Sequence, residues 1–309
     1  SAALRGGFSR IVLHHQPSLG ADARRELEAV RGLSLSAIEP RALLLESSPR
    51  LSSGTRERLY ARYLRLSKPA AKSNVLRVAI LAAQGGVYLD MDTLTLRELT
   101  SLGSVWGAFC GTEHVAFPSL PAHERKAFSG AKALVRSALR AVLARAPSGW
   151  RAFRRLARHY PLAANNAVLG AAAEHPLLLD LLERMSALPE QQAQRRFALG
   201  THLLQAAVRD YGGADLHLLP PAAFYPLGPV LSEHWFRYTR SPALSEVLSD
   251  ETRVVHWYAS LRSRRQQLRL SPGSVERDAS RQLFSALVQE LGFGQGQATK
   301  KNLAQLLMP

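Results

Sequence analysis

The chain has 309 residues, of which 46% are apolar and 21% are charged, so its composition excludes a disordered or low-complexity protein. No stretch approaches the roughly 18 uninterrupted apolar residues of a membrane-spanning helix, and a single cysteine, Cys110, excludes an intrachain disulfide framework. Forty Lys and Arg against 24 Asp and Glu give a formal charge of +16, which attracts anions such as nucleic acids, acidic lipids or phosphorylated ligands.

The N-terminal region predicts a parallel α/β unit. Residues 10–14 (RIVLH) and 41–46 (RALLLE) are short apolar runs typical of buried strands, and a helix is predicted between them near residues 22–31. A strand, a helix and a strand in this order favour a parallel pair. Another helix is predicted over residues 55–66, which ends before Pro69.

A helix, a glycine turn and a strand are predicted next. Residues 73–84 (SNVLRVAILAAQ) carry apolar residues at helical spacing, with Ser73 as the expected N-cap and Gly85 as the expected C-cap. Residues 87–89 (VYL) begin a strand that runs into an Asp-Met-Asp sequence.

That sequence, Asp90-Met91-Asp92, is the candidate metal site. Because residues i and i+2 of a strand point to one face, we expect both carboxylates to converge on one cation, with Met91 turned into the core. Carboxylate and phosphate oxygens suit Mg²⁺ or Mn²⁺, and a cation held this way neutralises a leaving nucleoside diphosphate. An Asp-x-Asp pair alone is a weak signal, since solvated strand ends also carry it.

Two later regions are strongly basic. Residues 113–160 hold ten Lys and Arg but only two acids, and their pattern predicts a helical insertion. Its apolar stripe, opposed by Lys132, Arg136 and Arg140, consists of Leu134, Val135, Ala138, Leu139, Val142 and Leu143. From residue 262 the chain is basic again, with helices predicted over residues 274–291 and 298–307. We therefore expect a catalytic domain over residues 1–261, with the insertion at about 113–160, and a helical extension over 262–309 packed on it.

The segments SNVLR at residues 73–77 and GGVYLDMD at residues 85–92 resemble the DxD sugar-transferase family, whose pattern reads S-D-x-x-R, a helix, and G-G-x-Y-x-D-x-D. The family includes bacterial mannosyl- and galactosyltransferases and the catalytic domains of the glucosylating clostridial toxins. The resemblance implies an α/β GT-A fold that uses a nucleotide sugar and a divalent metal.

The same resemblance implies roles for the motif residues. Asp92 would ligate the metal directly, and Asp90 would contact the ribose and assist the metal. Arg77 would lie near the donor sugar or its phosphates, and Tyr88 would belong to the donor site. Asn74 stands where the family has Asp, so hydrogen bonding to sugar hydroxyls is kept while the charge is lost.

Weaker matches follow downstream. Asn165 and Asn166 open an apolar strand where the family places an Asn near the donor sugar, although a plain turn would have the same residues. The segment GTHLL at residues 200–204 looks like the family's helix start facing the site, or a simple helix N-terminus.

The ends of the predicted domain carry three more candidates. His256, in VVHWY at residues 254–258, is either a third metal ligand or a packed core histidine. Ser260 and Arg262 follow and would hold the pyrophosphate. His14, His15 or Gln16, at the end of the first strand, would face the nucleotide base, or they are only a polar strand end.

The sequence therefore predicts a metal-dependent glycosyltransferase with Mn²⁺ or Mg²⁺ and a UDP-sugar donor, with UDP-glucose, UDP-galactose and UDP-GlcNAc all open. The family favours retention, and no marked Asp or Glu base for inversion is evident. The sequence does not identify the acceptor, which could be a small molecule, a lipid-linked glycan or a protein. We expect a cytoplasmic monomer or small homo-oligomer.

Alternative interpretations rest on charge. The basic insertion also fits a nucleic-acid-binding or membrane-surface protein with a vestigial transferase fold. No helix-turn-helix, RRM or zinc pattern supports nucleic acid, whereas an anionic membrane surface suits the Arg-rich amphipathic helices. A GC-rich genome would produce the same excess of arginine without any function.

Overall fold

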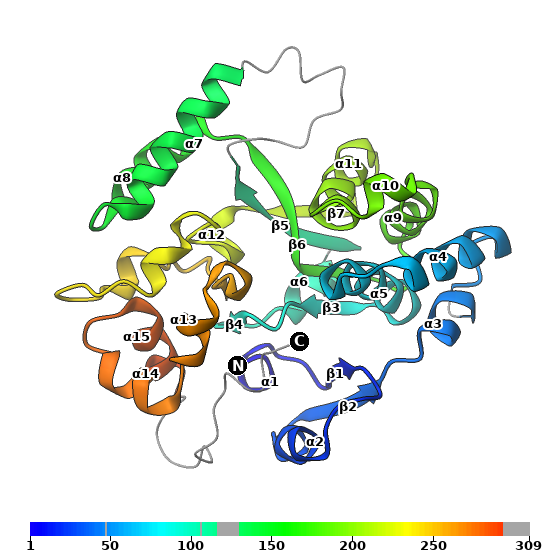
Figure 1. Cartoon of the computed structure of the whole chain (residues 1–309), viewed down its shortest axis with the longest axis horizontal. Coiled ribbons are helices and arrows are strands. Elements are labelled where there is room, and N and C mark those ends of the chain that lie inside the picture. The colour runs from blue at the N-terminus through cyan, green and yellow to red at the C-terminus, as the bar shows by residue number, and fades with distance from the viewer. Residues whose placement is uncertain (47, 106, 116–129, 293–309) are drawn as a thin grey trace.

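The computed structural model describes residues 1–46, 48–105, 107–115 and 130–292. The architecture is mixed α/β, as the sequence predicts, with a four-stranded sheet at its centre in the order β3-β6-β5-β7 (Figure 1). Strand β6 is antiparallel to β3 and to β5, whereas β5 and β7 are parallel. The strands are β3 (Gly86–Leu89), β5 (Ala108–His114), β6 (Leu162–Ala171) and β7 (Leu216–Leu219).

Two smaller sheets accompany the central one. The first pairs β1 (Ile11–His15) with β2 (Leu33–Ala37) in parallel, joined by α2 (Ala21–Glu28), which confirms the parallel unit expected here. The second pairs β4 (Thr93–Thr95) with β8 (Val254–His256) in antiparallel fashion. This second pairing joins the segment after the Asp-Met-Asp sequence to a strand far along the chain.

The prediction of a strand over residues 41–46 is wrong, because these residues form helix α3 (Pro40–Glu46). A short Ala and Leu run fits a buried helix as well as a strand, and Pro40 has a backbone suited to a helix start. The second strand is instead β2, whose sequence LSLSA alternates apolar and polar residues as a half-buried strand does.

Helices α4 (Ser53–Arg65) and α5 (Pro69–Gln84) follow, and both were expected. Helix α5 begins at Pro69, so Ser73 lies inside the helix and is not its N-cap, in contrast to the prediction. Gly85 is the C-cap, as predicted, with φ of +67°. A Cβ at Gly85 would lie 2.8 Å from the backbone nitrogen of Ala173, so this turn requires glycine.

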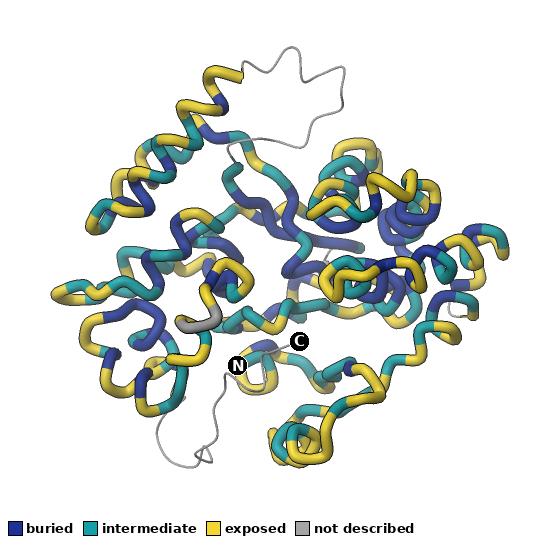
Figure 2. Tube along the Cα trace, in the orientation of Figure 1, coloured by how far each residue is buried: buried dark blue, intermediate teal, exposed yellow. Residues whose placement is uncertain are grey.

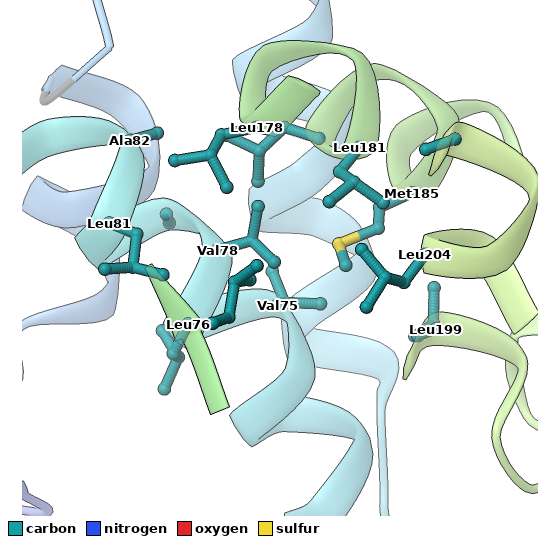
Figure 3. Close-up of a cluster of buried hydrophobic side chains, with 14 of the residues drawn as sticks. Val75, Leu76, Val78, Leu81, Ala82, Leu178, Leu181, Met185, Leu199 and Leu204 are labelled. Atoms are coloured by element: carbon teal, nitrogen blue, oxygen red, sulfur yellow. The ribbon is translucent and has the colours of Figure 1, made fainter. Parts of the chain in front are cut away.

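Helices α4, α5, α9 (Pro176–Ala187) and α11 (Leu203–Asp210) gather beside the central sheet and share one apolar core (Figure 1). Figure 3 shows Val75 and Val78 of α5 meeting Leu178 and Leu181 of α9. Burying each of these side chains contributes about 1.5–3 kcal/mol. This core holds α5 against the sheet, and α5 carries Asn74 and Arg77 toward the end of β3.

A second core is formed by helices and connecting segments outside the central sheet. Helices α7 (Gly130–Arg145), α8 (Gly149–Leu156) and α15 (Leu283–Glu290) contribute to it together with the turn η3 (Leu231–Trp235). The predicted helix over residues 274–291 is in fact two helices, α14 (Pro272–Asp278) and α15, and residues 298–307 lie outside the described part of the chain. The C-terminal helices thus share a core with the basic insertion, while the domain boundary at residue 261 stays a prediction.

Helix α7 buries a different set of positions from the predicted apolar stripe, and only Leu143 belongs to both. Four of the six residues in its predicted apolar stripe are exposed, and Leu134 is 66% exposed, whereas Arg140 is buried. Figure 2 shows exposed positions along much of α7. The helix packs against α8 and η3 through Ala133, Leu143 and Ala144, so most of the predicted stripe lies outside the contact.

The remaining elements are short connections. They are α1 (Ala2–Arg5), α6 (Thr100–Val105), α10 (Glu190–Ala193), α12 (Pro221–Phe224), α13 (Arg264–Leu268), η1 (Ala157–His159), η2 (Ala198–His202), η4 (Leu244–Glu246) and η5 (Ala259–Leu261). Within the described residues, none of the helices combines the length and the apolar character needed to cross a bilayer.

Candidate active site

The Asp-Met-Asp sequence lies in a turn between β3 and β4, and not on a strand as predicted. Met91 is 58% exposed, so the expectation that it turns into the core is also wrong. The backbone nitrogen of Asp90 donates to the Ala167 carbonyl at 2.8 Å, and the Thr93 hydroxyl donates to the Asp90 carbonyl at 2.7 Å. The two carboxylates converge because this turn is tied to β6, and not through the alternation of a strand.

The Asp92 carboxylate is held by the segment that follows β8. Its Oδ1 lies 3.0 Å from His256 Nε2, and its Oδ2 accepts a hydrogen bond of 2.7 Å from the backbone nitrogen of Ala259. Burial alone would raise the pKa of Asp92, but the hydrogen bonds from His256 and Ala259 outweigh it and lower that pKa. Asp92 is therefore ionised at neutral pH.

The Asp90 carboxylate is held from the opposite side by α5 and β3. Its Oδ1 accepts a hydrogen bond from the Tyr88 hydroxyl at 2.7 Å and lies 3.0 Å from Arg77 Nη2. Arg77 is buried against the Tyr88 ring, with its guanidinium carbon 4.3 Å from the ring centroid. Burial acts to lower the pKa of Arg77, but Tyr88 and Asp90 outweigh it, so the pKa is raised and the cation is kept.

A pair of amides lies beside this ion pair. Asn166 Nδ2 donates to Asn74 Oδ1 at 2.9 Å, and the Asn166 carbonyl accepts from Arg77 Nη1 at 2.7 Å. Gly200 closes the other side, since a Cβ there would lie 2.9 Å from Asn74 Nδ2. Three segments predicted separately, the start of α5, the start of β6 and the region around η2, therefore meet at one place.

A register shift in β6 explains why neighbouring asparagines face different surroundings. Cys110 pairs with Leu169 while Gly111 pairs with Asn165, so β6 has extra residues at this point. Asn166 consequently reaches Asn74, whereas Asn165 is buried and its Oδ1 accepts from the Ala167 nitrogen at 2.8 Å. Asn165 therefore maintains the bulge.

The side chains of Asp90, Asp92 and His256 offer one ligand atom each, and these atoms all lie within 4.8 Å of one another. Opposite ligands of an octahedral Mg²⁺ lie about 4 Å apart, so small side-chain movements would complete the site. Two carboxylates and one imidazole also suit Mn²⁺. His256 Nδ1 is buried without a hydrogen-bond partner among the described residues. The residues present thus fit a divalent cation.

A comparison with known protein families finds a match over the residues that carry the two carboxylates. Residues 34–108 match the family model described as the glycosyltransferase sugar-binding region containing the DXD motif. The match supports a DXD-motif glycosyltransferase family for this part of the chain. No curated protein matches the chain. The matched DXD region runs from β2 through α5 and β3 to β5, and so includes Asn74, Arg77 and both carboxylates. The mixed strand orientation of the sheets is consistent with a GT-A-like fold.

Three predicted residues do not join the DXD cluster through any contact seen in the described part of the chain. His14 lies on β1 in the separate parallel sheet, and burial lowers its pKa, with Arg10 and His15 adding to the effect. Ser260 is exposed in η5. Arg262 is buried and turned toward Ser232 and Glu233, with Nη1 3.2 Å from Glu233 Oε1. Their predicted roles in binding the nucleotide stay predictions.

The structure also has a cavity that the candidate site residues do not line. It is lined by Leu96, Asp250 and Glu290 among others. The convergence of functional groups, and not this cavity, therefore identifies the candidate site.

Sequence reasoning missed Glu113 and Tyr258. The Tyr258 hydroxyl donates to Glu113 Oε2 at 2.8 Å, and the Tyr258 ring lies 4.0 Å from the His256 ring between centroids. Burial raises the pKa of Glu113, although hydrogen bonds from Tyr258 and Asn165 oppose that rise. One available signal was that Glu113 is a rare acid in a basic region and ends an apolar strand.

Proposed function

We propose that the protein transfers a hexose from a UDP-sugar to an acceptor, with Mn²⁺ or Mg²⁺ bound by Asp90, Asp92 and His256. This proposal is supported above all by the convergence of these three side chains, whose ligand atoms lie within 4.8 Å of one another. Two of them, Asp90 and Asp92, lie in the segment that matches the DXD glycosyltransferase region. When bound, the cation would neutralise the negative charge that develops on the leaving nucleoside diphosphate.

The side chains around the cation would divide the remaining tasks. Arg77 keeps a buried positive charge beside Asp90, 3.0 Å from it, and adds to the electrostatic stabilisation of the diphosphate. The Asn74 and Asn166 amides offer neutral donors and acceptors that suit sugar hydroxyls. His256 and the Ala259 nitrogen hold Asp92 in place before the donor binds.

We further propose that the anomeric configuration is retained. An inverting transferase needs a carboxylate that accepts a proton from the acceptor hydroxyl. Asp90 and Asp92 belong to the metal cluster, and Glu113 is buried with its Oε2 bonded to the Tyr258 hydroxyl. These contacts leave the three carboxylates poorly suited to serve as that base.

The test is donor turnover with Mn²⁺ across a panel of UDP- and GDP-sugars. We expect metal-dependent release of one nucleotide, and a loss of about 100-fold or more in Asp92→Asn. Asp22→Asn is the matched control, because Asp22 is exposed on α2 and pairs only with Arg25 among the described contacts. Its turnover should equal that of the wild type. Absence of both turnover and calorimetric binding of every donor would contradict the proposal.

A second candidate, which complements the first, is binding to an anionic membrane surface through α7. Leu134, Val135 and Val142 are each more than half exposed on this helix, and Lys132 and Arg145 flank them. A peripheral cytoplasmic location would then bring the enzyme to a lipid-linked acceptor. Co-sedimentation with vesicles of anionic and of zwitterionic lipid tests this, and equal recovery with both would contradict it.

A further inference from the structure

Tyr258 has a backbone conformation that residues with a side chain rarely adopt. Its φ is +57° and its ψ is +62°, in the left-handed region. Such conformations persist only where the surrounding structure holds them, and they are concentrated at functional sites. The turn reverses the chain after β8, and the next backbone nitrogen, that of Ala259, consequently points at Asp92 Oδ2 at 2.7 Å.

The Tyr258 side chain is fixed by burial and by a hydrogen bond to Glu113. The phenol is 6% exposed and donates to Glu113 Oε2 at 2.8 Å, and Glu113 is itself only 9% exposed. Glu113 comes from β5, a strand of the central sheet, and its side chain is further bonded to Asn165. The same phenol ring packs against His256, the residue whose Nε2 lies 3.0 Å from Asp92 Oδ1.

The buried hydrogen bond between Tyr258 and Glu113 thus supports both groups that contact the Asp92 carboxylate, His256 and the Ala259 nitrogen. Through the turn it sets the direction of the Ala259 nitrogen, and through ring packing it sets the plane of His256. Without it, the left-handed turn loses a buried hydrogen bond to the central sheet, and both groups gain freedom to move away from Asp92.

We infer that Glu113 and Tyr258 are positioning residues that orient Asp92 and His256 for the cation. This inference rests on the proposed function, because it concerns the same metal site. Partners that orient metal ligands without touching the metal typically change metal affinity by 10- to 100-fold when they are removed.

The experiment measures Mn²⁺ affinity with Mn²⁺ alone, by calorimetry on the full chain, and the thermal midpoint of each variant. Tyr258→Phe removes only the hydroxyl, and we expect Mn²⁺ to bind about tenfold more weakly. Tyr211→Phe is the matched control, because the Tyr211 hydroxyl also donates to a carboxylate, that of Asp215, at 2.7 Å. Its Mn²⁺ affinity should equal that of the wild type.

Variants of the partner complete the test. Glu113→Gln keeps an oxygen that accepts from the phenol and should retain most of the affinity, whereas Glu113→Ala should lose as much as Tyr258→Phe. The double variant Glu113→Ala with Tyr258→Phe should lose no more than either single variant, since all three break the same hydrogen bond.

The outcomes separate this inference from the proposed function. Wild-type affinity in Tyr258→Phe, or additive losses in the double variant, would overturn the positioning role alone. Loss of affinity in Glu113→Gln equal to that in Glu113→Ala would also count against it. Absence of Mn²⁺ binding in the wild type would overturn the proposed metal site, and this inference with it.

Discussion

The DXD turn and helix α7 both mix charged and apolar residues, but they differ in which of these residues find partners within the protein. In the turn, Asp90 and Asp92 are drawn together and each has a partner, Arg77 for one and His256 for the other. On α7, Arg140 is buried while apolar side chains such as Leu134 face outward.

The difference teaches that charge content does not identify a site. The net charge of +16 draws attention to the basic helices, yet the described groups that converge as a metal cluster are two carboxylates of a short acidic turn and His256 of β8. Convergence requires that separate segments be held close together, and the central sheet provides this for the turn through β6 and β5. Four measurements would sharpen or break this comparison.

The largest expected change is in the free energy of unfolding when the buried face of α7 is altered. Leu143 is 9% exposed, so Leu143→Ala should lower the free energy of unfolding by about 3 kcal/mol through lost burial and a cavity. Leu134→Ala, on the same helix, should change it by less than about 0.5 kcal/mol because Leu134 is exposed. Urea denaturation measures both. The reverse order would show that the Leu134 end of the predicted stripe, and not Leu143, packs against the protein.

A somewhat smaller effect is expected at the buried ion pair. Arg77→Ala leaves the Asp90 carboxylate without its guanidinium partner. Because Asp90 is partly exposed, we expect the free energy of unfolding to fall by about 2 kcal/mol. The control is Arg97→Ala, which breaks the exposed pair with Asp250 and should cost less than about 1 kcal/mol. Chemical denaturation of both variants tests this, and equal losses would mean that the site pair is no better shielded than a surface pair.

Because Gly200 packs against the amide pair, we expect Gly200→Ala to lower the free energy of unfolding by about 1 kcal/mol or more. The added Cβ would meet Asn74 Nδ2 at 2.9 Å and Asn166 Nδ2 at 3.1 Å, so the two amides must move. In Gly273→Ala the new methyl group meets nothing within 4 Å, and helix α14 should be unchanged or slightly stabilised. Thermal unfolding compares the two, and a Gly200→Ala midpoint at or above that of the wild type would contradict close packing here.

Cys110 is a buried ionisable group that, unlike Asp90 and Asp92, has no charged partner among the described residues. We therefore expect the native protein to be unreactive toward thiol reagents. Burial raises the pKa of the Cys110 thiol to about 12, and the nucleophilic thiolate is therefore scarce at any lower pH. The native protein should not react with a disulfide reagent at pH 8, while the denatured protein should release one equivalent. Rapid labelling of the native protein would show that this strand is accessible.

Local patterns predicted much of the region around the DXD turn. Helix α5, the Gly85 cap and β3 follow from apolar spacing and glycine within one stretch of chain, and all three were found. The strand predicted over residues 41–46 failed because a short run of Ala and Leu does not distinguish a helix from a strand. The orientation of α7 failed because its partner surface comes from α8 and η3, about which its own sequence says nothing.

By itself the sequence determined the chemistry of the site: two carboxylates after a glycine turn, an arginine one helix earlier, and a family of transferases that shares them. Only the tertiary structure decided which other groups join them. His256 reaches Asp92 across 164 residues because β8 pairs with β4, and Glu113 reaches Tyr258 because β5 lies in the central sheet. Spacing along the chain reports on neighbours within a few residues, whereas long-range strand pairing depends on the packing of the whole molecule.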